Sequence, residues 1–127
     1  MSNPSDPTIL TRRTTANLTG KEYCLVVSSG SDDLALCGDA AAAIGALTND
    51  VADGSGGVAK HLPVQVGGMI KVKCGGTVTA GLMAASMANG LAINGDQSND
   101  YHFGIALESG GVNDILTFLW SPGGQEN

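Results

Sequence analysis

The side chains that could do chemistry are few and widely spaced in this 127-residue chain. The five that bind zinc most readily are Cys24, Cys37, Cys74, His61 and His102. No two of them lie at the CxxC or HxxxH spacing of zinc sites. Each cysteine sits in an alternating apolar run, as a small buried hydrophobe does. The sequence therefore favours structural cysteines, with no metal and no cofactor.

The carboxylates fall mainly in predicted turns, where aspartate serves backbone geometry. Asp96, Ser98 and Asp100 place oxygen atoms at alternate positions, like the start of a calcium loop. Tyr101 stands where that loop requires glycine, and Leu107 stands where it requires glutamate. An EF-hand is excluded, and a weak surface cation site at residues 96–100 remains open.

No catalytic constellation is evident. "GSGGVAK" has neither the spacing nor the following Ser or Thr of a phosphate-binding P-loop, and there is no Gly-x-Ser-x-Gly elbow. His61 could pair with Asp50 or Asp53, and His102 with Asp100, but no candidate nucleophile stands beside either histidine. We expect a protein that is not an enzyme.

Net charge excludes two classes of partner. The chain carries −6, has six basic residues, and its longest basic run is Arg12-Arg13. Nucleic-acid binders need clustered Lys and Arg, and anionic membranes repel an acidic protein. No apolar stretch is long enough to span a bilayer, and "MSNPSDPTIL" lacks the features of a signal peptide. We expect synthesis in a cytosol, with neither nucleic acid nor membrane as partner.

The sequence predicts that the elements that position any functional residue are β-strands. Two stretches, "AIGALTNDVADGSGGVAKHLPVQV" and "YHFGIALESGGVNDILTFLW", both run apolar–glycine–apolar, then an acidic glycine-rich loop, then apolar alternation. We interpret this repeat as a structural unit: a strand with a glycine gap, a loop and a partner strand. The predicted fold is all-β, a small compact barrel or sandwich of short antiparallel strands with glycine-rich turns. One short helical turn fits between Gly81 and Gly90.

Two hairpins follow from the alternation. In "HLPVQVGGMIKVKC" a three-residue loop over residues 67–69 would pair Val66 with Ile70, Val64 with Val72 and Leu62 with Cys74, keeping one face apolar. Pro63 would place the first of these strands at an edge or a bulge.

The second hairpin spans the last strand. Its register would set Ala106 opposite Leu116, Gly104 opposite Phe118 and His102 opposite Trp120. Gly104 would then make room for the Phe118 ring, and Gly45 would have the same role in the earlier copy.

The domain organisation is predicted as an extended N-terminal arm (1–20), one β domain (21–122) and a C-terminal tail (123–127). The arm holds an apolar island, Thr8-Ile9-Leu10, followed by Arg12 and Arg13. It is either a frayed terminus or an arm that orders on a partner, with Ile9 and Leu10 as anchors and the arginines pairing with acids.

The last strand is apolar on both faces. Leu116, Phe118 and Trp120 alternate with Ile115 and Leu119. An antiparallel strand with one wet face would alternate apolar with polar residues. A second sheet or another subunit must therefore cover the second face. Leu116, Phe118 and Trp120 are the predicted subunit-interface residues, and Trp120 fits a barrel plug equally well.

Five segments in order resemble the capsid cement (head decoration) proteins of tailed bacteriophages: "KEYCLVV", "AIGALTNDVADG", "VQVGGMIKVKCGGTVTAG", "MANGLAI" and "YHFGIALESGGVNDILTFLW". The resemblance covers residues 21–120. Leu82 departs from it, because relatives often have an acidic residue there.

The resemblance implies a compact β domain that forms a homotrimer. It implies binding to the outer surface of an assembled capsid, where the trimer clamps the major capsid protein, after synthesis in the bacterial cytoplasm.

Two alternatives of other classes stay open at this stage. A carbohydrate- or receptor-binding module would need an aromatic platform from Tyr23, Tyr101 and Trp120. A lipoyl-type carrier would need a lysine at a tight hairpin tip, which neither Lys60 nor Lys71 provides.

Overall fold

A computed structural model describes residues 8–28, 33–38, 43–56, 59–95 and 101–125. The first five strands are β1 (Thr8–Thr14), β2 (Leu25–Ser28), β3 (Leu34–Leu36), β4 (Gly45–Leu47) and β5 (Lys60–Gly67). The next five are β6 (Met69–Lys73), β7 (Met83–Met87), β8 (Leu91–Asn94), β9 (Tyr101–Ala106) and β10 (Ile115–Gln125), with a short 3-10 turn η1 (Ala88–Gly90) before β8. The fold is all-β, as the sequence predicts.

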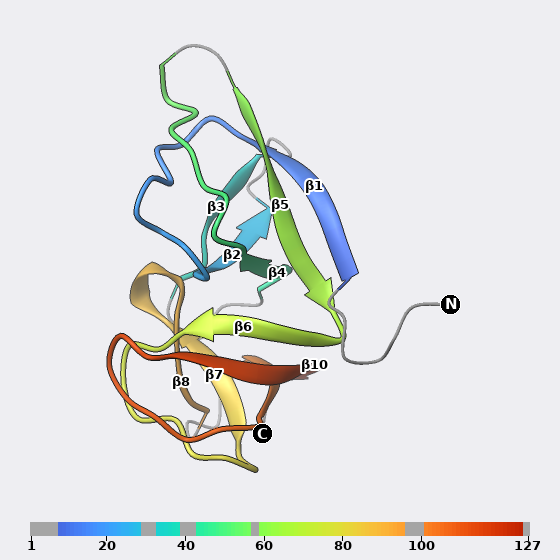
Figure 1. Cartoon of the computed structure of the whole chain (residues 1–127). Helices are drawn as coiled ribbons and strands as arrows, with labels where there is room; N and C mark the ends of the chain where they lie inside the picture. The colour runs from blue at the N-terminus through green and yellow to red at the C-terminus, as the bar shows by residue number, and fades with distance from the viewer. Residues whose placement is uncertain (1–7, 29–32, 39–42, 57–58, 96–100, 126–127) are drawn as a thin grey trace.

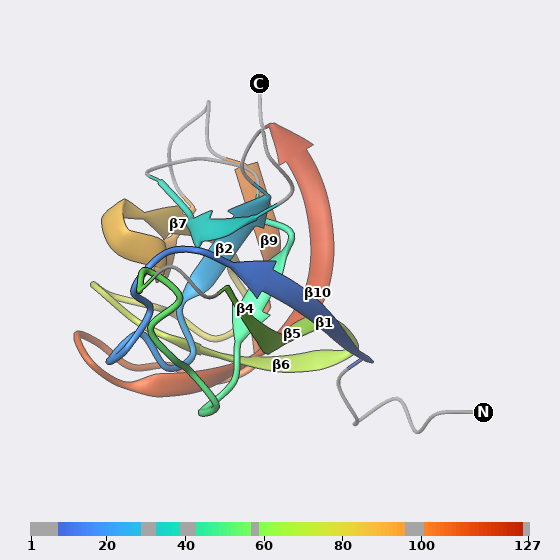
Figure 2. The same ribbon diagram turned by 90° about the horizontal axis from the view of Figure 1, so that it is seen from above.

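The strands form two antiparallel five-stranded sheets. The first has the order β1-β5-β4-β2-β3, and the second has the order β6-β10-β9-β7-β8. The sheets lie one above the other in Figure 1, and the first lies in front of the second when seen from above in Figure 2. The chain completes one sheet before it starts the next, so it divides into a first half (8–67) and a second half (69–125).

The two halves have the same topology. If β1 to β5 are matched in order with β6 to β10, the first strand order becomes the second. The registers agree as well, because Ile9 pairs with Gln65 as Met69 pairs with Leu119, and Leu25 pairs with Ala46 as Met83 pairs with Ile105. The equivalent positions, one from each half, are Ile9 and Met69, Gln65 and Leu119, Ala46 and Ile105, and Leu25 and Met83.

Local geometry supports this equivalence. Leu47 donates its amide hydrogen to the carbonyl oxygen of Cys24, and the matched Ala106 donates to Leu82. Two residues before Leu25, Tyr23 has a positive φ of 62°, and two residues before Met83, Gly81 has a φ of 88°. Each half is thus one copy of a single structural unit.

Each sheet curls until its edge strands approach each other. In the first half the buried Thr14 hydroxyl donates to the carbonyl oxygen of Leu34, which joins β1 to β3. In the second half Cys74 forms an isolated parallel bridge with Ala92, which joins the end of β6 to β8. Each half therefore closes at one end, as a small barrel does.

Two apolar cores result. One lies inside the first half and includes Leu47, Leu62 and Val64. The other is built on Ile70, Val72 and Phe118 of the second half, and it also contains Leu25, Cys37 and Ala46 of the first half. One face of the first sheet therefore belongs to the core of the second half, and this shared core joins the two halves.

The predicted hairpin over residues 62–74 is wrong in its pairing. β5 pairs with β1 and β4, whereas β6 pairs with β10, so the two strands belong to different sheets. The short connection at Gly68, with a φ of 71°, redirects the chain from one sheet to the other. Leu62, Val64, Val72 and Cys74 are buried, but in two cores. Alternation gave the inward faces correctly and gave no information on the partner strand.

The predicted second hairpin exists, with a register shifted by two residues. Gly104 lies opposite Trp120, Phe118 lies opposite Ala106, and a bulge follows Trp120. A Cβ on Gly104 would collide with the carbonyl oxygen of Leu119, and a Cβ on Gly45 would collide with that of Gln65. Both glycines therefore admit a neighbouring main chain, and no aromatic ring requires the space. Pairing of strand, loop and partner strand in both copies confirms the repeat as a structural unit.

The segments at the two ends extend the domain. Described residues of the predicted arm form β1, and Leu18 is part of the first core. β10 continues to Gln125, which includes part of the predicted tail. The predicted helical turn between Gly81 and Gly90 is η1, preceded by the strand β7. Pro63 lies in β5 opposite Thr11 of β1, just beyond the residues that pair with β4.

Candidate binding surfaces

The residues considered for metal chemistry do not assemble. Among the residues that the structure describes, no three His, Cys, Asp or Glu side chains come together in a way that could hold a metal ion. Cys24, Cys37 and Cys74 form no disulfide bond and are buried. Burial raises the pKa of all three thiols, and it raises that of Cys74 to about 11. They are therefore protonated and apolar at neutral pH, which disfavours metal binding and nucleophilic attack.

The histidines lie in separate environments. His102 is buried, and its Nε2 lies 3.1 Å from the carbonyl oxygen of Gly95. His61 is exposed in β5, opposite Arg13 of β1. The cation site considered at residues 96–100 lies outside the described residues.

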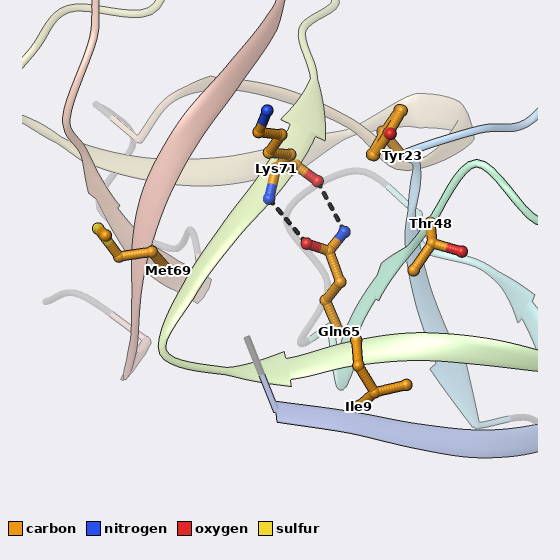
Figure 3. Close-up of a pocket in the computed structure, with 6 residues that line it drawn as sticks. All are labelled: Ile9, Tyr23, Thr48, Gln65, Met69 and Lys71. Carbon is orange, nitrogen blue, oxygen red and sulfur yellow. Dashed lines mark hydrogen bonds between the residues drawn. The ribbon is translucent and has the colours of Figure 1, made fainter. Parts of the chain in front are cut away.

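A pocket of about 300 Å³ lies where the two halves meet. It is lined by Ile9, Tyr23, Thr48, Gln65, Met69 and Lys71, shown in Figure 3. The Gln65 side chain forms one wall. Its Oε1 accepts from the Lys71 amide at 3.0 Å, and its Nε2 donates to the Lys71 carbonyl at 3.1 Å and to the Leu47 carbonyl at 3.0 Å. The lining brings hydroxyl groups from Tyr23 and Thr48 and the side chain of Lys71, with no histidine, cysteine or carboxylate among these six residues.

The predicted arm residues lie along β1, which is an edge strand of the first sheet. Thr8, Ile9 and Leu10 are exposed. Arg13 pairs with Asp33 of its own chain through a 2.7 Å contact between Nε and Oδ1, and Arg12 donates from Nη2 to the Ser28 hydroxyl at 3.4 Å. These bonds within the chain fix the basic half of the arm, so Ile9 and Leu10 remain as its free apolar side chains.

The three residues predicted to lie at a subunit interface face inward. For Leu116 and Phe118 the prediction is therefore wrong. Leu116 and Phe118 are core residues, covered by their own chain. Trp120 is partly buried and packs against the same core, with its ring centroid 6.3 Å from that of Phe103. Ile115, just before Leu116, and Leu119, between Phe118 and Trp120, are the exposed apolar residues of this strand.

Strand pairing extends this exposed face across the second sheet. Met69 pairs with Leu119, Leu119 with Ile105 and Ile105 with Met83, so one apolar row crosses four strands. We call Met69, Leu119, Ile105 and Met83 the outer row. Leu119 and Met83 are each 42% exposed, and Leu107 and Ile115 add exposed apolar surface on the neighbouring strand ends. Met69 and Ile105 between them are half-buried, so the row forms a partly exposed apolar surface, and large exposed apolar patches are typical of interaction sites.

Part of this surface could be predicted from the sequence. The doubly apolar last strand indicates that its second face needs a cover, and Ile115 and Leu119 lie on that face. Met69, Met83 and Ile105 come from three other strands, and only the register places them beside Leu119.

The alternative functions gain no support from the described residues. Trp120 packs on Phe103, Tyr23 lines the pocket between the halves, and Tyr101 lies at the start of β9, so the three rings occupy separate places and form no shared platform. Lys60 begins β5 and Lys71 lies within β6, so neither occupies a tight hairpin tip. Within the described part of the chain, no helix has the length and apolarity needed to cross a membrane.

Comparison with known proteins gives a likeness of fold. No protein-family model and no curated protein sequence matches the chain. Among solved structures, it is similar to the N-terminal base of the head fiber protein gp8.5 of bacteriophage phi29, with a TM-score of 0.73 and 18% identity. The match covers 96% of this chain and 100% of the other. At this identity the likeness shows that the two share a fold.

Proposed function

We propose that this protein is a non-enzymatic structural component of a tailed-bacteriophage particle. In this proposal it binds the outer surface of the assembled head as a homotrimer and stabilises the shell by clamping neighbouring copies of the major capsid protein. The observation that carries the proposal is the fold shared with the base of a phage head fiber over nearly the whole chain.

Three features of the chain support this function. Its described histidines, cysteines and carboxylates form no metal cluster, and burial raises the pKa of its three thiols, which disfavours the reactive thiolate. Its charge of −6 disfavours contact with packaged DNA. It carries exposed apolar surface at two places, along the outer row and on β1. A binder of other proteins needs such surfaces, and an enzyme of this size would need a cleft with reactive groups.

Stabilisation would follow from binding linkage. A protein that binds the assembled shell and not its loosened form stabilises the shell by mass action. Three linked copies would add avidity to a weak individual contact. The proposed contact with the capsid is the side of β1 that carries Ile9, which is 48% exposed.

The direct test is co-sedimentation of the purified protein with heads of the phage that encodes it. Unassembled major capsid protein, run on a size-exclusion column with this chain, is the control. We expect saturable binding to heads and none to free subunits. Protein that stays in the supernatant at micromolar concentration would contradict the proposal.

A substitution pair tests the contact. Ile9→Asp should weaken binding to heads at least tenfold, because it places a charge in an apolar contact. Val112→Asp alters a residue that is more exposed and far along the chain in the loop before β10, and it should bind like the wild type. Deletion of residues 1–17 is unsuitable for this purpose, since it removes β1 and the buried Thr14.

A further inference from the structure

The equivalence of the two halves allows each surface of one half to be compared with its counterpart in the other. In the first half the counterpart of the outer row is Ile9, Gln65, Ala46 and Leu25, which we call the covered row. Gln65, Ala46 and Leu25 are buried, and Ile9 at the edge of the sheet is 48% exposed; Leu25 and Ala46 belong to the core of the second half. The same sheet face is thus covered in the first half and exposed in the second.

The second half supplies the cover through two features. One is the free edge of β6, where the main chain of Lys71 bonds to the Gln65 side chain and the Lys73 amide donates to the carbonyl oxygen of Tyr23 at 2.9 Å. The other is the inward face of β6, where Ile70 and Val72 are fully buried in the core shared with Leu25. We call the edge and inward face of β6 the receiving surface.

The counterpart of the receiving surface in the first half is open at two positions, and the half-buried Arg12 stands there in place of Val72. β1 matches β6, so Leu10 is the equivalent of Ile70 and Thr11 is the equivalent of Lys71. Ile70 is 0% exposed, whereas Leu10 is 46% exposed. β1 is an edge strand, as β6 is, and Thr11 is exposed. The first half therefore presents an uncovered receiving surface, and the second half presents an uncovered outer row.

We propose that a second copy of this chain joins these two surfaces. The outer row of one copy docks on β1 of the next copy, in the way that the covered row docks on β6 within one chain. Leu119 of one copy would then lie by Thr11 of the next, as Gln65 lies by Lys71. A contact between two different surfaces is heterologous, and it forms a ring where the rotation closes.

The occupant is a second copy because this one chain carries both of the surfaces that the contact needs. Within one chain the covered row already packs against β6. Each copy also leaves an outer row and a β1 strand uncovered. An unrelated partner would explain either surface alone, but it would not explain why the exposed pair matches the buried pair. The contact is inferred from the structure, whereas the number of three copies in the ring rests on the proposed function. A ring of three chains would contain six equivalent halves.

The first measurement is the solution mass of the purified chain without capsids, by light scattering after size exclusion. We expect a multiple of the 12.7 kDa chain mass, and three copies if the ring is the proposed trimer. Leu119→Glu, in the outer row, and Leu10→Glu, on β1, should each reduce the mass to 12.7 kDa with an unchanged circular dichroism spectrum. Val112→Glu alters a 65% exposed apolar residue outside both surfaces and should keep the wild-type mass.

Mixing the two monomeric variants tests the head-to-tail arrangement. The Leu119→Glu chain keeps an intact β1, and the Leu10→Glu chain keeps an intact outer row. One of each should therefore associate into a species of twice the 12.7 kDa chain mass that grows no further. A contact between two outer rows would instead leave Leu10→Glu associated by itself, and mixing would rescue nothing. Met83→Glu in place of Leu119→Glu provides a second outer-row variant if the first fails to fold.

Two results would overturn the inference: a monomeric wild-type chain at tens of micromolar, or an oligomer that both variants leave intact. Neither result depends on capsids. If heads fail to bind an oligomer that behaves as described, the proposed function is removed and this contact stands. A monomer that binds heads would overturn this contact and the trimer of the proposed function, and it would leave the binding to heads standing.

Discussion

Gly45 and Gly104 occupy the same position in the two halves of the chain. A Cβ on Gly45 would collide with the carbonyl oxygen of Gln65, and a Cβ on Gly104 would collide with that of Leu119. Gln65 and Leu119 are themselves equivalent residues on β5 and β10. The same close approach of two main chains therefore occurs in both halves, although the residue on the partner strand is a glutamine in one half and a leucine in the other.

Substitution of either glycine should be costly. Gly45→Ala and Gly104→Ala each force a strand away from its neighbour, and we expect each to lower the free energy of unfolding by about 2–3 kcal/mol. Gly111→Ala is the matched control, because a Cβ there meets nothing within 4 Å, and its effect should stay within about 0.5 kcal/mol. Urea denaturation followed by circular dichroism measures all three. Equal stabilities for Gly104→Ala and Gly111→Ala would refute the close-approach explanation.

Gln65 should hold the two halves together through its side-chain amide. Gln65→Leu keeps most of the volume but leaves main-chain groups of Lys71 and Leu47 without their bonding partner. We expect a loss of about 2–3 kcal/mol in the free energy of unfolding. Hydrogen exchange should show faster exchange of the Lys71 amide in the variant. If that amide exchanged at the wild-type rate, the bond between the halves would be unimportant.

Asp33 should give the protein an acid-sensitive contact. Hydrogen bonds from Arg13 and Thr15 lower the pKa of the Asp33 carboxyl below its ordinary value of 3.8. Because the folded-state pKa is lowered, the stabilisation is complete above the ordinary value and is lost as pH falls through the folded-state pKa. Asp33→Asn should therefore flatten the decline in melting temperature between about pH 4 and pH 2. Parallel pH profiles of the variant and the wild type would contradict this role.

Cys74 should act in the opposite pH range. Burial raises its pKa from 9.0 to about 11, so the folded state keeps a proton that the unfolded state releases. Stability is unaffected below the ordinary value and falls as pH rises from 9.0 toward 11. Cys74→Ala should be less stable at pH 7 because it leaves a cavity, yet its stability should fall less between pH 8 and pH 10.5. An identical alkaline slope in the two proteins would exclude the thiol as a cause.

Trp120 and Leu119 should behave differently although they are neighbours. Trp120 packs on Phe103 and the core, so Trp120→Ala should lower the free energy of unfolding by about 2–3 kcal/mol without changing the solution mass. Leu119 points to the other face of the sheet, and Leu119→Ala should weaken self-association while costing little stability. Light scattering and thermal unfolding on the same samples separate these effects. A Trp120→Ala monomer would return Trp120 to the interface.

The pattern of apolar and polar residues predicted the fold class and most of the side chains that face inward. Leu62, Val64, Val72 and Cys74 alternate with less buried neighbours, and they are buried because a strand sends successive side chains to opposite faces. The glycine-gapped repeat likewise indicated a structural unit used twice. The alternation could not name a partner strand, because the same period fits a hairpin and a crossing between sheets. The pairing of β5 with β4, and of β6 with β10, depends on contacts distant in sequence.

By itself, the sequence determined that this chain is acidic, built from short strands, poor in reactive groups and doubly apolar in its last strand. Those properties are local, since they depend on residue types and their period. The tertiary structure alone decided that Leu116 and Phe118 are core and that Leu119 joins Met69, Ile105 and Met83 in an exposed row. Which face of a strand is covered depends on where the other half of the chain packs. Here the second half covers the first, and nothing within the described chain covers the outer row.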